Sequence, residues 1–158
     1  MIEVLVGMIS SGKSTWAKNR AKEGWLIMND DGIVNVLHAN EYTLYDKNLR
    51  PLYKGIEDHI LHSVVLLGRN LVIDRGLDIC DKARQRWIIL GRSLDVPVRA
   101  VMFERFIPEV HAARRFASDS RGHTREYWAD VAKAHDARFV VPTLSEGFSE
   151  VLIKKWES

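Results

Sequence analysis

A phosphate-binding motif near the start of the sequence constrains the fold more than any other feature. Residues 7–15 read GMISSGKST, which fits the pattern GxxxxGK[ST] at every specified position. The glycines let the backbone curl so that successive N–H groups converge on phosphate oxygens. A short apolar segment, residues 2–6, precedes the motif, and a helix is expected over about 13–22. The pattern therefore predicts a strand, a phosphate loop and a helix whose positive end faces a bound anion.

This loop predicts a nucleoside triphosphate site, with ATP and Mg²⁺ as cofactors. The residues expected to contact the nucleotide are Gly7, Ser10, Ser11, Gly12, Lys13, Ser14 and Thr15. Lys13 would place its charge on the β- and γ-phosphates, and the Ser14 hydroxyl would bind magnesium. The alternative is a glycine-rich turn without a ligand, which the flanking strand and helix disfavour. The motif is equally compatible with hydrolysis, transfer and sensing.

Apolar segments alternate with amphipathic ones along the rest of the chain. Strands are expected at 2–6, 25–28, 71–73, 98–103 and 150–154, and helices at 13–22, 33–38, 56–67, 79–94, 108–116 and 124–137. Apolar residues in 40–54 show no clear helical or strand-like spacing. The alternation predicts an α/β fold: a three-layer P-loop NTPase with a mainly parallel sheet of four to five strands, forming one domain over 1–158. Ligands should then bind at the carboxyl ends of the strands.

Composition excludes some other classes of protein. The sequence has one cysteine, Cys80, so neither an internal disulfide nor a multi-cysteine zinc site can form. No apolar run approaches the length of a membrane span, and no basic residues precede the first apolar stretch as in a secretory signal. We therefore expect a soluble, cytoplasmic protein. The net charge of +2 is too small to argue for nucleic acid by itself.

Five segments, in order, resemble the P-loop polynucleotide kinases, which are related to adenylate-kinase-like phosphotransferases. They are GMISSGKSTWAKN (7–19), NDD (29–31), LVIDRG (71–76), RRFASDSRGHT (114–124) and VVPTLSEGFSEV (140–151). The resemblance covers most of the chain. It implies transfer of the γ-phosphate of ATP to a hydroxyl, with the 5′-hydroxyl of DNA or RNA as the expected acceptor.

The resemblance assigns Asp30 as the general base on the acceptor hydroxyl. The chemistry agrees, because transfer needs a carboxylate near the attacking oxygen, and Asp30 follows a predicted strand. Asp30 or Asp31 could instead cap the following helix, and we expect one to cap and the other, Asp30, to be catalytic. The family usually has an arginine three residues after this aspartate. Here Ile33 stands at that position.

Asp74 and Arg75 follow the predicted strand at 71–73. Asp74 resembles the carboxylate that holds a magnesium-bound water or orients Ser14, or it could bind the acceptor or cap the next helix. After this aspartate the family often has Thr-Asn, whereas this chain has Arg75-Gly76. Arg75 could therefore contact an acceptor phosphate in place of the arginine missing at position 33.

The segment at about 114–126 resembles an arginine-bearing helical lid. Arg115 and Arg121 are expected to stabilise charge on the transferring phosphoryl group, because planar guanidinium groups match its oxygens. A solvated basic helix end is the alternative for Arg114. Helix 79–94 is expected to expose Arg84, Arg86 and Arg92. The tryptophans at 16, 87 and 128 fall at helical positions typical of packing.

Two rival functions stay open. One is a kinase for another hydroxyl, in a hydroxymethylated base, a nucleoside or a small metabolite. The other is a nucleotide-dependent switch, which would not need a base at Asp30. A nucleic-acid acceptor is the expected macromolecular partner, and no membrane association is expected.

Overall fold

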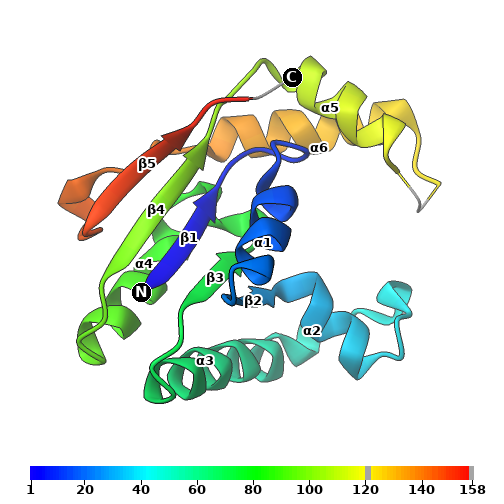
Figure 1. Ribbon diagram of the computed structural model, residues 1–158. Helices are drawn as coiled ribbons and strands as arrows, with labels where there is room; N and C mark the ends of the chain where they lie inside the picture. The colour runs from blue at the N-terminus through cyan, green and yellow to red at the C-terminus, as the bar shows by residue number, and fades with distance from the viewer. Residues whose placement is uncertain (120–121, 157–158) are drawn as a thin grey trace.

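The computed structural model describes residues 1–119 and 122–156, and within them five strands form one parallel sheet (Figure 1). The strands are β1 Ile2–Val6, β2 Leu26–Asn29, β3 Leu71–Asp74, β4 Val98–Phe103 and β5 Glu150–Lys154. Their order is β2-β3-β1-β4-β5, and every pairing is parallel. The α/β fold with a parallel sheet predicted from the sequence is confirmed.

Helices and short 3-10 turns connect the strands. The helices are α1 Lys13–Lys22, α2 Asp30–Leu37, α3 Arg50–Leu66, α4 Asp81–Ser93, α5 Pro108–Ala117 and α6 Arg125–Arg138. The 3-10 turns are η1 Tyr42–Leu44, η2 Lys47–Leu49, η3 Gly76–Ile79 and η4 Leu144–Glu146. Figure 1 shows α5 and α6 beyond the carboxyl ends of the strands. Among the described residues, no helix is long and apolar enough to cross a membrane.

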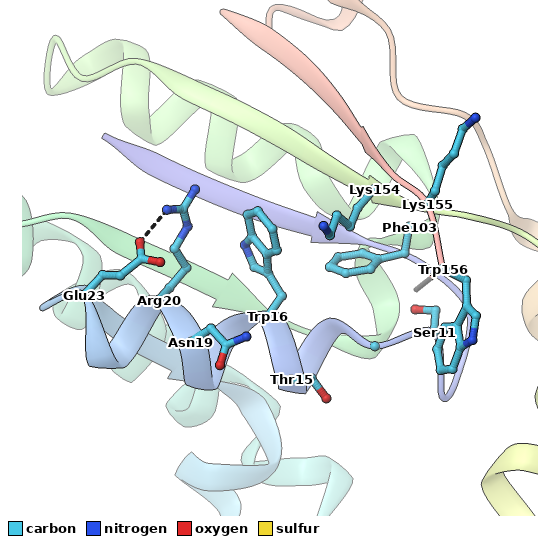
Figure 2. Close-up of a pocket in the computed structure, with 11 residues that line it drawn as sticks. Ser11, Thr15, Trp16, Asn19, Arg20, Glu23, Phe103, Lys154, Lys155 and Trp156 are labelled. Atoms are coloured by element: carbon cyan, nitrogen blue, oxygen red, sulfur yellow. Dashed lines mark hydrogen bonds and ion pairs between the residues drawn. The ribbon is translucent and has the colours of Figure 1, made fainter. Parts of the chain in front are cut away.

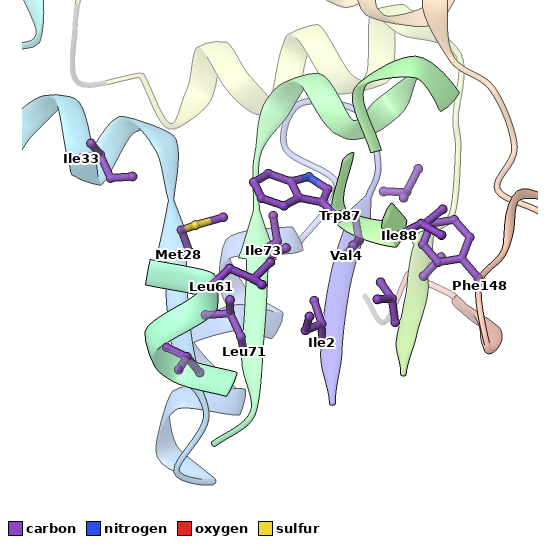
Figure 3. Packing of buried hydrophobic residues seen from close by; sticks show 14 of the residues in the cluster. Ile2, Val4, Met28, Ile33, Leu61, Leu71, Ile73, Trp87, Ile88 and Phe148 are labelled. Atoms are coloured by element: carbon purple, nitrogen blue, oxygen red, sulfur yellow. The ribbon is translucent and has the colours of Figure 1, made fainter. Parts of the chain in front are cut away.

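The sheet is buried on both faces, which gives the molecule three layers. One face packs against α3 and α4 through a large apolar cluster that includes Leu61, Trp87 and Phe148 (Figure 3). The opposite face packs against α1 through a smaller cluster around Leu5 and Phe103. Burial on both faces explains why β1 and β3 are almost continuously apolar in the sequence instead of alternating.

The tract at 40–54, which has no clear period, contains η1, η2 and the first turn of α3. Helix α3 begins at Arg50, earlier than the predicted start at 56, with a proline in its first turn. The rings of Tyr42 and Tyr45 stack at 6.2 Å, and those of Tyr45 and Tyr53 at 5.6 Å. Ring stacking, which has no fixed sequence period, organises this region, so hydrophobic periodicity could not reveal it.

The predicted exposure of the α4 arginines is wrong for Arg84, which is fully buried. Its guanidinium donates to both carboxylate oxygens of Glu146, at 2.7 Å each, and to the carbonyl oxygens of Ile79 and Val140. Bidentate pairing makes such a burial tolerable. Arg84 thus ties the segment after α6 to the start of α4. Trp87 and Trp128 are buried, as predicted for packing residues.

Candidate active site

The strand order brings three functional segments to one edge of the sheet. β1 is central and β3 lies beside it, so the loop after β1 and the end of β3 are neighbours. β2 pairs with β3 in a register that sets Asn29 opposite Asp74. Because all strands are parallel, the phosphate loop, Asp74 and Asp30 converge at their carboxyl ends.

Two glycines of the loop are required by its shape. A Cβ on Gly7 would lie 2.4 Å from the Ser11 Oγ and 3.0 Å from the Phe103 Cβ, so any side chain there would displace its neighbours. Gly12 has φ of +98° and caps the start of α1 in the left-handed conformation. The loop residues predicted from the motif therefore form a tight turn at the amino end of α1, where backbone N–H groups and the helix dipole favour an anion.

Lys13 lies inside this loop. Its buried Nζ donates hydrogen bonds to the carbonyl oxygens of Gly7, at 2.8 Å, and Met8, at 2.7 Å. Burial lowers the pKa of Lys13 to about 8, although the carboxylates of Asp74, Asp30 and Asp78 oppose that shift. The loop thus holds an ammonium group close to the place where phosphates would bind.

Ser14 and Asp74 form the magnesium-site candidate predicted from the sequence. The Ser14 Oγ donates to the Asp74 Oδ2 at 3.1 Å, and the Asn29 Nδ2 donates to the Asp74 carbonyl at 3.0 Å. A hydroxyl and a carboxylate are the hard oxygen ligands that Mg²⁺ prefers, with waters and phosphates completing its shell. The two side chains therefore fit the ion. The cap residues of η3 and α4 are Arg75 and Cys80, so Asp74 does not cap the next helix.

The helix after β2 is capped by Asn29, so the expectation that Asp30 or Asp31 supplies the cap is wrong. The Asn29 Oδ1 accepts from the Gly32 N–H at 2.9 Å. Asp30 is the first residue of α2, and its side chain is 31% exposed. Burial raises the pKa of Asp30 to about 6, and the Arg75 guanidinium partly opposes this. A partly exposed carboxylate with this pKa suits a general base near neutral pH.

Arg75 lies among carboxylates. Its Nε is 3.0 Å from the Glu57 Oε1 and 3.7 Å from the Asp30 Oδ2, and its Nη1 is 3.5 Å from the Asp78 Oδ1. The sequence indicated neither Glu57 nor Asp78 as a site residue. Glu57 falls within the apolar pattern of α3, and Asp78 follows β3 by four residues in a turn. Glu57 and Asp78 are recognisable as site residues only because both contact Arg75 in the folded protein.

The segment predicted as a lid, 114–126, comprises the end of α5, the start of α6 and the connection between them. The Arg115 guanidinium stacks on the Trp128 ring at 4.6 Å, and that of Arg114 stacks on Trp156 at 3.8 Å. Arg115 therefore packs between α5 and α6. Arg121, the other predicted lid arginine, lies outside the described residues.

His111, a fully buried residue of α5, connects this region to the phosphate loop, and no sequence pattern indicated this contact. Its Nε2 accepts from the Phe106 N–H, so its Nδ1 carries the proton and donates to the Ile9 carbonyl at 2.9 Å. Burial lowers the pKa of His111, in keeping with a neutral ring. A neutral histidine thus fixes α5 against the loop.

A pocket of about 310 Å³ opens beside the loop (Figure 2). It lies between α1, the end of β4 and the segment after β5. Three aromatic side chains, Trp16, Phe103 and Trp156, contribute to its wall, together with the loop residues Ser11 and Gly12. Its apolar rings and its position beside the phosphate loop suit a flat heterocycle attached to the phosphates.

A family model described as an AAA domain matches residues 2–139, which is most of the chain. The chain belongs to this AAA domain family. The match begins in β1 and reaches past the end of α6, so this AAA domain includes the phosphate loop, Asp30 and the end of β3. No curated protein matches.

Solved structures resemble this AAA domain over nearly its whole length. A candidate kinase from Chloroflexus aurantiacus is 14% identical, with a TM-score of 0.69 over 98% of this chain and 84% of that one. A gluconokinase from Sinorhizobium meliloti is 16% identical, with a TM-score of 0.60 over 97% and 81%. Kti12 from Chaetomium thermophilum, solved with ADP-AlF3, is 16% identical, with a TM-score of 0.59 over 99% and 90%. At these identities the similarity shows that the chain shares its fold with these three proteins.

Proposed function

We propose that the protein is an ATP-dependent kinase that transfers the γ-phosphate to a hydroxyl group. One observation carries the proposal: the carboxylate of Asp30, with its pKa raised to about 6, lies at the same sheet edge as Lys13 and the Ser14–Asp74 pair. A phosphate loop alone would suit a switch as well. A carboxylate poised to accept a proton beside it favours transfer.

The donor would bind along the loop. Backbone N–H groups of residues 7–15 would surround the phosphates, and Lys13 would exchange its carbonyl partners for β- and γ-phosphate oxygens. The pocket beside Gly12 would take the adenine ring. Ser14 and Asp74 would hold Mg²⁺, which when bound neutralises charge on the phosphates. The Kti12 relative, solved with ADP-AlF3, supports a nucleotide at this fold.

In the transfer step, Asp30 would accept the proton of the acceptor hydroxyl as its oxygen attacks the γ-phosphorus. The bond between the γ-phosphorus and the bridging oxygen of the β-phosphate breaks, and ADP leaves. Lys13 would stabilise the charge that develops on the phosphate oxygens. The segment 114–126 is proposed to act as a lid that excludes water, with Arg115 and Arg121 as the arginines that would stabilise charge on the transferring phosphoryl group.

Two classes of acceptor compete. The order of motifs supports the 5′-hydroxyl of DNA or RNA. The place of Arg75 among carboxylates, and the gluconokinase among the structural relatives, support a small hydroxyl compound, which we favour. The single cysteine is consistent with a reducing compartment, and we propose a cytoplasmic location.

Transfer of radiolabelled γ-phosphate from ATP tests the proposal. The acceptors should include 5′-hydroxyl DNA and RNA, DNA with hydroxymethylated bases, nucleosides, sugars and short alcohols. Asp30→Asn should lower transfer by about 10²-fold or more, whereas the matched variant Asp31→Asn should keep most of it. Equal loss in both variants would argue against Asp30 as the specific base. ATP binding without labelled product on any acceptor would favour the switch.

A further inference from the structure

The carbonyl groups of the phosphate loop point in two directions. Those of the two residues before Ile9 accept hydrogen bonds from the Lys13 Nζ, at 2.8 and 2.7 Å. The carbonyl of Ile9 instead accepts from the Nδ1 of His111 on α5, at 2.9 Å. A trans peptide unit is planar, with its C=O and N–H on opposite sides. Because His111 holds the Ile9 carbonyl, the N–H of Ser10 points away from His111.

The backbone around Ser10 has the shape of an anion site. The φ of Ser10 is +49°, in the left-handed region, and that of Gly12 is +98°, whereas Ser11 between them has no positive φ. This alternation gathers consecutive N–H groups into a concavity that suits an anion. Among the described residues, no acceptor takes the Ser10 N–H. A phosphate oxygen can therefore use this N–H, provided that the peptide between Ile9 and Ser10 keeps its orientation.

The loop alone does not fix that orientation. A left-handed φ is unfavourable for serine, because serine has a Cβ. Lys13 also offers a rotated Ile9 carbonyl an alternative donor, since its ammonium group has three hydrogens and the two preceding carbonyls take two of them. A half-turn of the peptide would bring the Ile9 carbonyl into the loop and take the Ser10 N–H out of it. A donor outside the loop selects one orientation, and His111 is that donor.

His111 is held in the tautomer that donates from Nδ1. It is fully buried, and its Nε2 accepts from the Phe106 N–H at 3.2 Å, which leaves the proton on Nδ1. The side chain of Ile9 packs against the buried cluster around Trp128, between α5 and α6. The two helices thus hold Ile9 by its carbonyl group and by its side chain.

We propose that His111 is a positioning residue for phosphoryl transfer: it holds the peptide between Ile9 and Ser10 so that the Ser10 N–H faces the phosphates of the donor. The inference rests on the proposed kinase function and names a residue that supports it from outside the loop. His111 acts through Ile9 and contacts neither substrate. A donor that is already oriented stabilises the charge that develops on phosphate oxygens in the transition state, because no reorganisation is needed there.

Two variants of His111 separate the hydrogen bond from packing. In His111→Asn the amide nitrogen lies near the place of the imidazole Nδ1 and can donate to the Ile9 carbonyl, whereas His111→Leu fills the site without a donor. Both variants lose the acceptor for the Phe106 N–H. The difference between them therefore reports the bond to Ile9. The control is Ser149→Ala, which removes a side-chain bond to the Val98 carbonyl at the opposite end of the strands.

The first measurement is the amide NMR resonance of Ser10 in isotope-labelled protein, with and without ADP and Mg²⁺. ADP should shift this resonance in the unmodified protein, in His111→Asn and in Ser149→Ala, and the shift should be largely lost in His111→Leu. The second measurement is kcat for labelled transfer from ATP to the acceptors named above. It should fall about tenfold or more in His111→Leu and only a few-fold in His111→Asn. Urea unfolding checks that each variant is folded in the assay.

The outcomes separate this inference from the kinase. A Ser10 resonance that does not respond to ADP in the unmodified protein would overturn the inference, whether or not either variant folds. Equal loss of transfer in both His111 variants, with the Ser10 shift intact in both, would also overturn it and leave the kinase standing. A Ser10 shift lost only in His111→Leu, without transfer by the unmodified protein to any acceptor, would contradict the kinase and support the orientation of the loop by His111.

Discussion

The proposed donor side and the proposed acceptor side of the site are built in different ways. The donor side is one continuous segment, residues 7–15, whose backbone makes the loop and whose Lys13 lies within it. The acceptor side combines Asp30 from α2, Glu57 from α3, Arg75 after β3 and Asp78 from η3. A site made of backbone on one segment tolerates few sequence changes and is recognisable. A site made of side chains from four segments can change its specificity while the fold persists.

The largest effect is expected on the donor side, from Lys13→Met. Methionine keeps most of the buried volume and removes the charge that would neutralise the phosphates, so kcat for transfer should fall by about 10³-fold. Steady-state kinetics with ATP would measure this. A fall of less than about tenfold would show that Lys13 does not contact the phosphates and would contradict the proposed donor site.

On the acceptor side, Glu57→Gln should affect stability and the base together. Glu57 is buried and pairs with Arg75 and Arg86, so its loss removes one carboxylate partner from each of two partly buried cations, at a cost of about 3 kcal/mol in the free energy of unfolding. Because Glu57 helps to raise the pKa of Asp30, that pKa should also fall. Urea unfolding and a pH–rate profile would measure both.

The exposed pair of Glu150 and Arg99 gives the matched control for that prediction. Glu150→Gln should change the free energy of unfolding by less than about 0.5 kcal/mol, because a solvent-exposed ion pair contributes little. Equal costs for the two variants would mean that the acceptor-side cluster contributes no more to the fold than a surface pair does.

The pH dependence of transfer should report Asp30. A general base acts in its ionised form, and burial raises the pKa of Asp30 to about 6. The rate should therefore be level between pH 6 and the pKa of Lys13, about 8, and fall about tenfold for each pH unit below pH 6. In Glu57→Gln the midpoint should move to lower pH. If the pH midpoint of transfer by the unmodified protein lay near the ordinary pKa of aspartate, the base would not be a desolvated carboxylate.

The smallest effect is expected from Trp156→Ala. Trp156 contributes to the wall of the pocket beside Gly12 and stacks on Arg114, so its loss should raise the KM for ATP a few-fold, about what one aromatic contact is worth, with kcat nearly unchanged. Leu66→Ala, an equally simple truncation at an exposed position, should leave KM unchanged. A change in kcat without a change in KM would indicate that the adenine ring does not bind beside Trp156.

The sequence by itself determined the phosphate loop, the parallel α/β sheet and the place of Asp30 and Asp74 at strand ends. These follow from local rules: glycine conformation, the spacing of apolar residues, and the convergence of parallel strands at one edge. The cap of α2 was assigned to the wrong residue because Asn29, Asp30 and Asp31 are adjacent and all have capping side chains. The sequence alone cannot show which of three adjacent residues caps the helix, because that depends on where the backbone turns into the helix.

Only the tertiary structure decided what surrounds Arg75. Residues 30, 57, 75 and 78 are far apart in the chain, or separated by a turn, and no local pattern brings their charges together. The same holds for Arg84 and Glu146, 62 residues apart, and for His111 and Ile9, 102 residues apart. A charged group that is buried needs an oppositely charged or hydrogen-bonding partner, and which groups are buried depends on how the helices pack on the sheet. The proposed acceptor site therefore depends on how the molecule packs, whereas the phosphate loop is encoded in nine consecutive residues.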